Sequence, residues 1–220
     1  MGQMITLTAA DGHAFSAYRA DPDGPPKGGL VVVQEIFGVN GHIQSVCDGF
    51  AGDGYAVIAP AYFDRLRPGV DMDYSAESVA AGRELAMQIG WDGPMQDTAA
   101  AAAALKDAGH VGVVGYCWGG SVAWLAATRL ALPGVGYYGG RTAGLIDETP
   151  QAPVMLHFGE KDSHIPQEDV DKIAAAHPDV PIHLYPAGHG FNCDARADFH
   201  PESASLARER TMAFFAETLG

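Results

Sequence analysis

The stretch of sequence that decides the fold is Gly115-Tyr-Cys-Trp-Gly-Gly120. It lies between the apolar run Val111–Val114, which predicts a buried strand, and Gly120–Ala131, whose spacing predicts a helix. A glycine two residues before and two residues after a central nucleophile is typical of a nucleophile elbow, a sharp turn between strand and helix. We therefore expect Cys117 to project above a sheet at a helix N-terminus, where the helix dipole favours a thiolate.

This stretch has two other interpretations. The first is a buried cysteine with a packing role in a glycine-rich turn. The second is a dinucleotide-binding loop, because Gly112, Gly115 and Gly119 loosely follow that pattern. Such a loop is followed, about 20 residues later, by an acidic residue. The chain has Tyr137 and Tyr138 in that region, so the sequence argues against a dinucleotide cofactor.

Working outward from the elbow, apolar strand runs alternate with helical patterns. A tight turn at Asp11-Gly12 predicts a hairpin that opens the chain. Alternation of this kind predicts an α/β fold with a mainly parallel twisted sheet and helices on both faces, and ligands then bind at the carboxyl ends of the strands. The predicted strands are Met4–Thr8, His13–Arg19, Leu30–Val33, Tyr55–Ala59, Val111–Val114, Gly134–Tyr138, Val154–Phe158 and Ile182–Tyr185; the predicted helices are Ile43–Phe50, Ser75–Ile89, Asp97–Ala108, Gly120–Ala131, Gln167–His177 and Glu202–Leu219.

Composition narrows the class of protein. With 220 residues, 47% of them hydrophobic and 18% charged, we expect one globular domain over residues 1–220. The net charge of −14 argues against nucleic acid or an anionic lipid surface as a partner. We expect a cytoplasmic protein, because no apolar stretch has the length of a membrane helix and the first residues lack the features of a signal peptide. Three scattered cysteines predict neither a disulfide framework nor a metal site.

An acid and a histidine follow later predicted strands. Asp162 comes shortly after Val154–Phe158, and His189 comes shortly after Ile182–Tyr185. An aspartate in a turn or a histidine beside glycine is usually structural when it occurs alone. The chain order nucleophile, acid, histidine at the ends of successive strands, however, is that of the α/β-hydrolase catalytic triad. The sequence therefore predicts that Cys117, Asp162 and His189 converge at one edge of the sheet.

Four segments together resemble the dienelactone hydrolase family, and the similarity runs over nearly the whole chain. They are Gln34–Gly38, the elbow, Gly136–Gly139 and Ala187–Phe191. This resemblance implies the α/β-hydrolase fold. It also implies a carboxylic ester hydrolase, similar to carboxymethylenebutenolidase, that opens an activated enol lactone such as a dienelactone through a cysteine acyl-enzyme.

The resemblance also implies a role for each site residue. Cys117 would be the nucleophile, His189 the base, Asp162 the acid that orients it and Glu35 a fourth catalytic carboxylate. The backbone N–H groups of Ile36 and Trp118 would form the oxyanion hole. Neither a metal nor an organic cofactor is expected. For Glu35, which follows a predicted buried strand, a capping or salt-bridged structural role is the alternative.

A cysteine nucleophile limits the kinds of ester that the protein can cleave efficiently. A thiolate leaves easily, so its adduct with an alkyl ester tends to expel sulfur, whereas an enol ester departs as a stabilised enolate. The sequence therefore favours an activated lactone, with a broader carboxylesterase or thioesterase as the alternative. A third interpretation is a non-catalytic redox sensor that uses Cys117. The presence of the acid and the base argues against a sensor.

A dienelactone carries a carboxylate, so an arginine is expected near the site. Relatives have an arginine four residues after the histidine, where this chain has Cys193. Arg83 and Arg196 are the candidates to take its place. A second thiol near the pocket is one interpretation of Cys193, and packing is the other.

Overall fold

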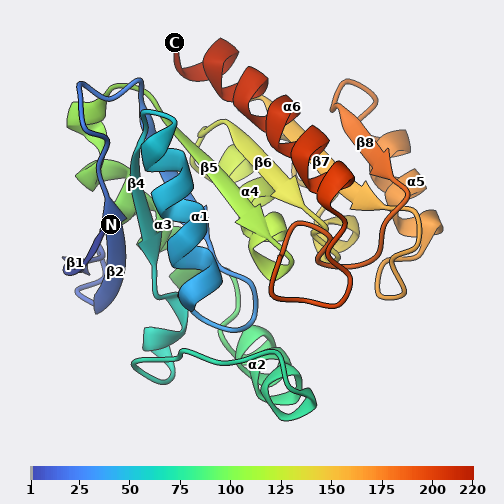
Figure 1. The fold of residues 1–220 in the computed structure, drawn as a ribbon, viewed down its shortest axis with the longest axis horizontal. Helices are drawn as coiled ribbons and strands as arrows, with labels where there is room; N and C mark the ends of the chain where they lie inside the picture. Colours follow the sequence, from blue (N-terminus) through green and yellow to red (C-terminus); the bar gives the residue numbers. More distant parts are fainter. Residues whose placement is uncertain (1) are drawn as a thin grey trace. The chain divides into compact units, whose positions relative to one another are not determined.

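The computed structural model describes residues 2–220 as two compact units (Figure 1). One unit comprises the described residues up to Val113 together with Leu219–Gly220, and the other comprises Val114–Thr218. Strand β5 (Val111–Tyr116) and helix α6 (Pro201–Leu219) each begin in one unit and end in the other.

The first unit contains the hairpin and two strands of the sheet. β1 (Gln3–Thr8) pairs antiparallel with β2 (Ala14–Ala20), which confirms the predicted hairpin. β2 pairs antiparallel with β4 (Ala56–Pro60), and β4 pairs parallel with β3 (Gly29–Val33). Every residue of β3 and β4 is buried, which is why both appear in the sequence as continuous apolar runs rather than alternating patterns.

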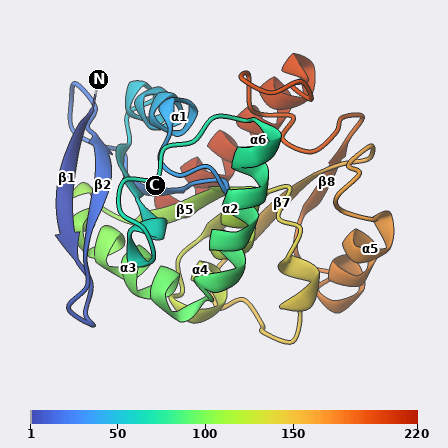
Figure 2. The same cartoon turned by 90° about the horizontal axis from the view of Figure 1, so that it is seen from below.

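Two helices of the first unit cover opposite faces of these strands. α1 (Gly41–Gly52) lies on one face of β3 and β4, and α3 (Asp92–Ala104) lies on the other (Figure 2). α2 (Ala76–Gln88) begins at its predicted cap, because the Ser75 hydroxyl accepts a hydrogen bond from the Ser78 amide. Two 3-10 turns, Tyr62–Arg65 and Lys106–Ala108, complete this unit.

The bounds of α3 differ from the prediction. The helix begins five residues before the expected Asp97 and ends at Ala104, after which a 3-10 turn continues to Ala108. Gly93 and Pro94 appear in the sequence as helix breakers, but they occupy the first turn. Amide groups there have no acceptor within the helix, so proline is tolerated.

A buried ion pair fastens α3 to the 3-10 turn at Arg65. Arg65 donates two hydrogen bonds of 2.8 Å to Asp97, whose side chain is fully buried, and one of 2.7 Å to Asp11, whose side chain is 41% exposed. We expect Asp97→Ala to lower the free energy of unfolding by about 3 kcal/mol, because it leaves a desolvated guanidinium short of its partner. Asp11→Ala is the matched control and should have a much smaller effect. Urea titrations of the two variants measure this, and equal effects would contradict the assignment.

The second unit carries the end of β5, which leads into the elbow, and the three strands that follow the elbow. In sheet order they are β5, β6 (Gly134–Tyr137), β7 (Val154–Gly159) and β8 (Ile182–Tyr185), and β7 pairs parallel with both neighbours. α4 (Trp118–Arg129) and α6 lie on opposite faces of β6 and β7 (Figure 2). α5 (Gln167–Ala176) and a 3-10 turn at Thr142–Gly144 complete this unit.

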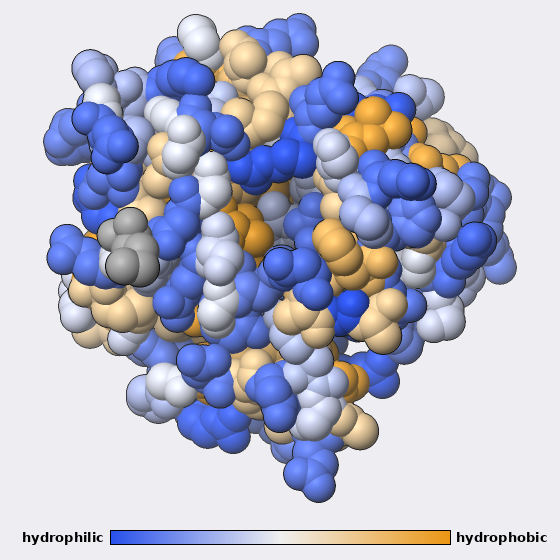
Figure 3. Space-filling model, viewed as in Figure 1, coloured by the Kyte–Doolittle hydropathy of each residue, from blue (hydrophilic) through white to orange (hydrophobic). Residues whose placement is uncertain are grey.

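Hydrophilic residues dominate the face of the molecule drawn in Figure 3, and apolar residues occur there in small groups. Apolar side chains instead fill the interior, where Phe15, Phe50, Trp124 and Phe158 are almost completely buried. Over residues 2–220, we find no helix with the length and apolar character needed to cross a membrane.

Candidate active site

Cys117 occupies the strained turn between β5 and α4. Its backbone has φ 56° and ψ −118°, a region that residues with a Cβ rarely adopt. Two backbone hydrogen bonds of 2.9 Å hold this conformation: the Cys117 amide donates to Tyr137, and the Cys117 carbonyl accepts from Gly120. α4 begins at Trp118, two residues before the predicted start, so Cys117 is the residue that caps it.

Two glycines allow this turn to form. A methyl group added at Gly115 would overlap the carbonyl oxygen of Gly119, and one added at Gly120 would overlap the carbonyl oxygen of Tyr137. Strand β5, helix α4 and the end of β6 thus approach one another more closely than side chains permit. For Gly115, one of the two glycines whose spacing predicted the elbow, this close approach is the physical cause.

In the second unit, Asp162, His189 and Cys117 converge as predicted, and His189 contacts both of the other residues. His189 Nδ1 is 2.7 Å from Asp162 Oδ2, and His189 Nε2 is 3.2 Å from Cys117 Sγ. Asp162 and His189 are buried, whereas Cys117 is partly exposed. The arrangement can move a proton between sulfur and imidazole while the carboxylate holds the imidazole ring in one orientation.

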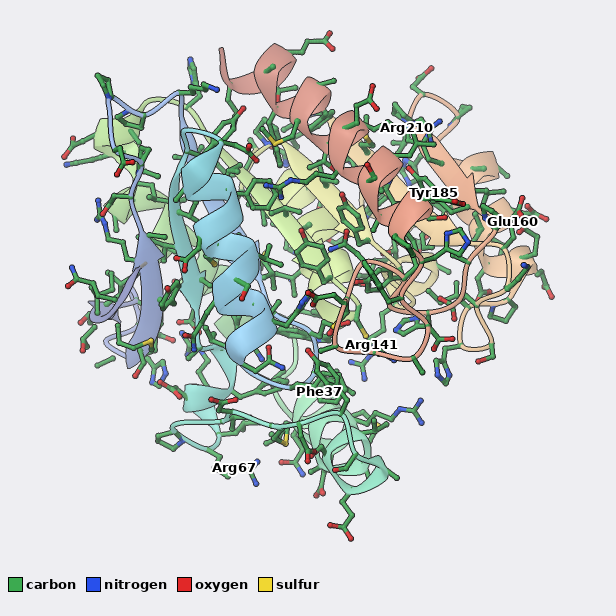
Figure 4. All side chains as sticks on the ribbon, in the orientation of Figure 1. Phe37, Arg67, Arg141, Glu160, Tyr185 and Arg210 are labelled. Carbon is green, nitrogen blue, oxygen red and sulfur yellow. The ribbon has the colours of Figure 1, made fainter. Side chains whose placement is uncertain are left out.

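Backbone hydrogen bonds join the loops that carry the acid and the histidine. The Glu160 amide donates to the Tyr185 carbonyl at 2.8 Å. Figure 4 labels these two residues near each other. The Lys161 amide donates to the Ala187 carbonyl at 3.0 Å. These bonds extend the pairing of β7 and β8 beyond the strand ends, so the two loops leave the sheet together.

The Asp162 carboxylate is held through its second oxygen as well. Oδ1 accepts hydrogen bonds from the backbone amides of His164 at 2.8 Å and Ile165 at 3.2 Å. Oδ2 is therefore left to face His189, which fixes the orientation of the imidazole.

The charge on His189 depends on its neighbours. Burial lowers the pKa of His189, but the negative charge of an ionised Cys117 and the hydrogen bond to Asp162 outweigh burial and raise this pKa to about 10. His189 therefore keeps its proton at neutral pH as long as the sulfur beside it is a thiolate.

This dependence can be measured. We expect the His189 ring in the wild-type protein to lose its proton near pH 10, and we expect its pKa to be lower in Cys117→Ala, because that variant lacks the thiolate charge. Nitrogen-15 NMR of the histidine side chains across the pH range measures both values. The same pKa in the two proteins would show that the sulfur does not interact with the imidazole.

Two aromatic rings that sequence reasoning did not assign to the site contact His189. The Tyr138 ring lies edge-on at 5.1 Å between centroids, and the exposed His164 ring lies edge-on at 5.2 Å. Tyr138 has φ 38°, and its amide donates to the His157 carbonyl at 2.7 Å, so its backbone is held in an unusual conformation beside the base. The run Gly136-Tyr-Tyr-Gly139 at a strand end was the sequence feature that could have indicated Tyr138.

The two candidate arginines fall in different units. Arg196 lies in the second unit, where its guanidinium covers Gly190, the residue next to His189; a methyl group at Gly190 would lie 2.6 Å from Arg196 Nη1. Arg83 is exposed on α2 in the first unit. Cys193 is fully buried, and its amide donates to the Gly190 carbonyl.

Glu35 and Ile36 lie in the first unit, directly after β3. The Glu35 side chain is almost completely buried. The backbone carbonyl of Glu35 accepts a hydrogen bond of 3.2 Å from the Gln34 side chain. Ile36 and Phe37 are also buried. The catalytic roles of Glu35, Ile36 and Trp118 stay predictions, and so do those of Cys117, Asp162 and His189.

Comparisons with known proteins identify the family and the fold. The model of the dienelactone hydrolase family matches residues 15–219. The chain is 36% identical to an Azospirillum brasilense protein provisionally named carboxymethylenebutenolidase, covering 98% of this chain and 99% of the relative. It is 31% identical to the carboxymethylenebutenolidase of Pseudomonas putida, covering 96% of this chain and 95% of the relative.

Among solved structures, a crystal structure from Klebsiella pneumoniae subsp. pneumoniae, provisionally named dienelactone hydrolase, superposes with a TM-score of 0.85. It is 30% identical and covers 98% of this chain and 99% of that chain. The α/β-hydrolase fold and the hydrolase class expected from the sequence are thereby confirmed. The chain belongs to the dienelactone hydrolase family.

Proposed function

We propose that this hydrolase cleaves an activated ester through a thioester on Cys117, and that its preferred substrate is an enol lactone that carries a carboxylate. The observation that carries the proposal is the contact of 3.2 Å between Cys117 Sγ and His189 Nε2, with Asp162 on the opposite side of the imidazole. Relatives named carboxymethylenebutenolidase support the lactone, because that name describes an enzyme acting on an unsaturated lactone.

In the first step, the Cys117 thiolate attacks the lactone carbonyl carbon. The S–C bond forms, the ring C–O bond breaks, and the enolate leaves with the electron pair of the broken bond. The imidazolium of His189 gives its proton to this enolate, which becomes a ketone. Formation of the thioester removes the thiolate charge that raises the pKa of His189, so the proton is released at the stage where the leaving group needs it.

In the second step, neutral His189 takes a proton from water, and the resulting hydroxide attacks the thioester carbon. The acyl–sulfur bond breaks, and the electron pair returns to Cys117 as a thiolate beside the reprotonated imidazole. The product is a keto dicarboxylic acid, because the substrate's own carboxylate is retained and the acyl carbon becomes a second carboxylate. Asp162 keeps the ring in the tautomer required for both steps, because its oxygen accepts from Nδ1.

Glu35 and the two amides complete the proposal. Between turnovers Glu35 gives a proton to the Cys117 thiolate, which leaves a thiol that is less readily oxidised. When substrate arrives, Glu35 takes this proton back, and the sulfur becomes the thiolate that attacks in the first step. The amides of Ile36 and Trp118 donate to the oxygen that becomes negative in the tetrahedral adduct. The buried position of Glu35 right after β3 and the position of Trp118 at the start of α4 support these roles.

Arg196 is the candidate that the geometry favours for binding the substrate carboxylate. Its guanidinium covers the residue next to His189, and a guanidinium pairs with a carboxylate through two parallel hydrogen bonds. Arg196 would thus supply the arginine that a carboxylate-bearing substrate needs, since the position four residues after the histidine holds Cys193.

A matched pair of substrates tests the proposal. We expect kcat/KM for a carboxymethylene butenolide to exceed that for the same lactone ring without the enol double bond by at least about 100-fold, a difference of about 2.7 kcal/mol in activation free energy. Ethyl esters, p-nitrophenyl esters and acyl thioesters of similar size complete the panel. The enol lactone is expected to have the highest kcat/KM.

Two results would overturn this reading of the substrate. Alkyl esters or thioesters with a kcat/KM well above that of the enol lactone would make the chain a broader carboxylesterase or thioesterase with the same side chains. Hydrolysis of no activated ester, together with rapid oxidation of Cys117 by peroxide, would favour the redox sensor.

A further inference from the structure

Residues 70–82 of the first unit lead into α2 and include its first half. They are called here the α2 segment. It packs against Ile36-Phe37-Gly38, the turn that follows β3 and holds the proposed oxyanion donor Ile36. Both stretches belong to the same compact unit.

Backbone contacts join the α2 segment to this turn. The Met72 amide donates to the Phe37 carbonyl at 3.0 Å, and Gly38 forms an isolated antiparallel bridge with Asp71. Gly38 has φ 83°, and a methyl group there would overlap the carbonyl of Val70. The turn therefore has a short strand-like pairing with the segment and no space for a side chain between them.

Side chains add to these contacts. The Tyr74 ring packs edge-on against Phe37 at 4.7 Å between centroids; Figure 4 labels Phe37 beside the segment that leads into α2. Asn40 caps α1 through the Ile43 amide, and its side-chain nitrogen donates to the Tyr74 hydroxyl at 3.1 Å and to the Met72 carbonyl at 3.3 Å. The turn is thus held on one side by the cap of α1 and on the other by the α2 segment.

Gly82 makes a second close approach. It lies within α2 and is buried, and a methyl group added there would overlap the Ile36 carbonyl oxygen and lie 3.1 Å from Ile36 Cβ. Alanine is more favourable than glycine at an open position within a helix. Glycine at this position therefore has a packing reason, which is that the α2 backbone lies directly on Ile36.

We propose that Gly82 is a positioning residue for the oxyanion hole: by letting α2 lie against Ile36, it fixes the direction of the Ile36 N–H. This inference rests on the proposed function, because it assigns the Ile36 amide to the tetrahedral adduct. The carbonyl that a methyl group at Gly82 would displace is separated from the Ile36 amide by a single Cα. An oxyanion donor acts only when it lies about 2.7–3.1 Å from the developing charge, so a small displacement is enough to weaken it.

The test compares Gly82→Ala with Gly52→Ala. Gly52 lies at the end of α1, and a methyl group there meets no atom within 4 Å. For Gly82→Ala we expect kcat on an activated ester to fall by at least about 10-fold, within the loss that follows removal of one oxyanion donor. KM should change by less than about threefold, and Gly52→Ala should match the wild type.

Alkylation of Cys117 by iodoacetamide separates a specific effect on the oxyanion hole from a general loss of structure. A general loss would change the alkylation rate as well as the hydrolysis rate. In that reaction the sulfur bonds to a methylene carbon and iodide leaves, so no carbonyl oxygen becomes negative. We expect the alkylation rate of Gly82→Ala to equal that of the wild type within about twofold, because the sulfur, the imidazole and the acid are unchanged. Unchanged kcat, or an equal loss of hydrolysis and alkylation, would overturn the inference.

If Gly82→Ala does not fold, as judged by circular dichroism, Tyr74→Ala replaces it with the same two readouts, because Tyr74 holds the same turn through Phe37 and Asn40. The wild type separates this inference from the proposed function. If wild-type protein hydrolyses no activated ester, the proposed function fails. If the wild type is active and depends on Cys117 while the variants keep its kcat, only the role of the α2 segment fails.

Discussion

Replacing Cys117 with alanine is expected to lower kcat/KM for an activated ester by about 10⁴-fold or more, the scale on which loss of a nucleophile acts in triad hydrolases. Alanine removes the atom that forms the acyl-enzyme, and only binding and the oxyanion donors are left. Alanine is smaller than cysteine and therefore fits in the strained turn at this position. The variant should keep the wild-type fold. Steady-state kinetics on the enol lactone, together with circular dichroism, measure both expectations.

Two companion variants sharpen this test. Cys117→Ser should lose most of the lactone hydrolysis, because a hydroxyl is far less ionised than a thiol beside the same imidazole. Cys47→Ala is the control for the loss of a thiol, since Cys47 is fully buried in α1, where burial raises the pKa of its thiol. Turnover in Cys117→Ala close to that of wild type would show that another group is the nucleophile.

The second large effect is expected at His189. His189→Gln should lower kcat by about 10³–10⁴-fold, because His189 contacts Cys117 Sγ and is the group proposed to give a proton to the leaving group and then to activate water. Glutamine keeps a polar side chain of similar size in the buried space beside Asp162. The measurement is kcat on a single activated ester at several pH values.

His164→Gln is the matched control for this substitution. The His164 ring contacts His189 at 5.2 Å between centroids, yet it is exposed and has no assigned step in the reaction. Its variant should keep kcat within a fewfold of wild type. If the two variants lost equal activity, the base would not be assigned to His189 alone.

The triad was accessible from sequence because its residues follow buried strands. β8 has the predicted bounds, Ile182–Tyr185, and β7 begins at the predicted Val154 and ends one residue after Phe158. Parallel strands present their carboxyl ends at one edge of the sheet. The chain order of Cys117, Asp162 and His189 then predicted contacts that the structure contains.

Other features had no local pattern to indicate them. The contact of Arg65 with Asp97 joins residues 32 positions apart, and the contact of Arg196 with Gly190 depends on how a loop folds back. The predicted helix at Asp97–Ala108 missed the early start of α3, where Pro94 lies in the first turn and is tolerated. Gly82 could not be distinguished in the sequence from a tolerated helical glycine, since its reason lies in Ile36, far away along the chain.

The most direct test of the central claim is the mass of the enzyme during turnover. Samples mixed with the enol lactone and quenched in acid within milliseconds are digested, and the peptides are analysed by mass spectrometry. Ring opening by sulfur adds the whole mass of the lactone, and we expect that mass on the peptide containing Cys117 and its absence from the Cys117→Ala protein. Turnover with the acyl group on a different residue, or with no mass added at Cys117 in any quenched sample, would contradict the account.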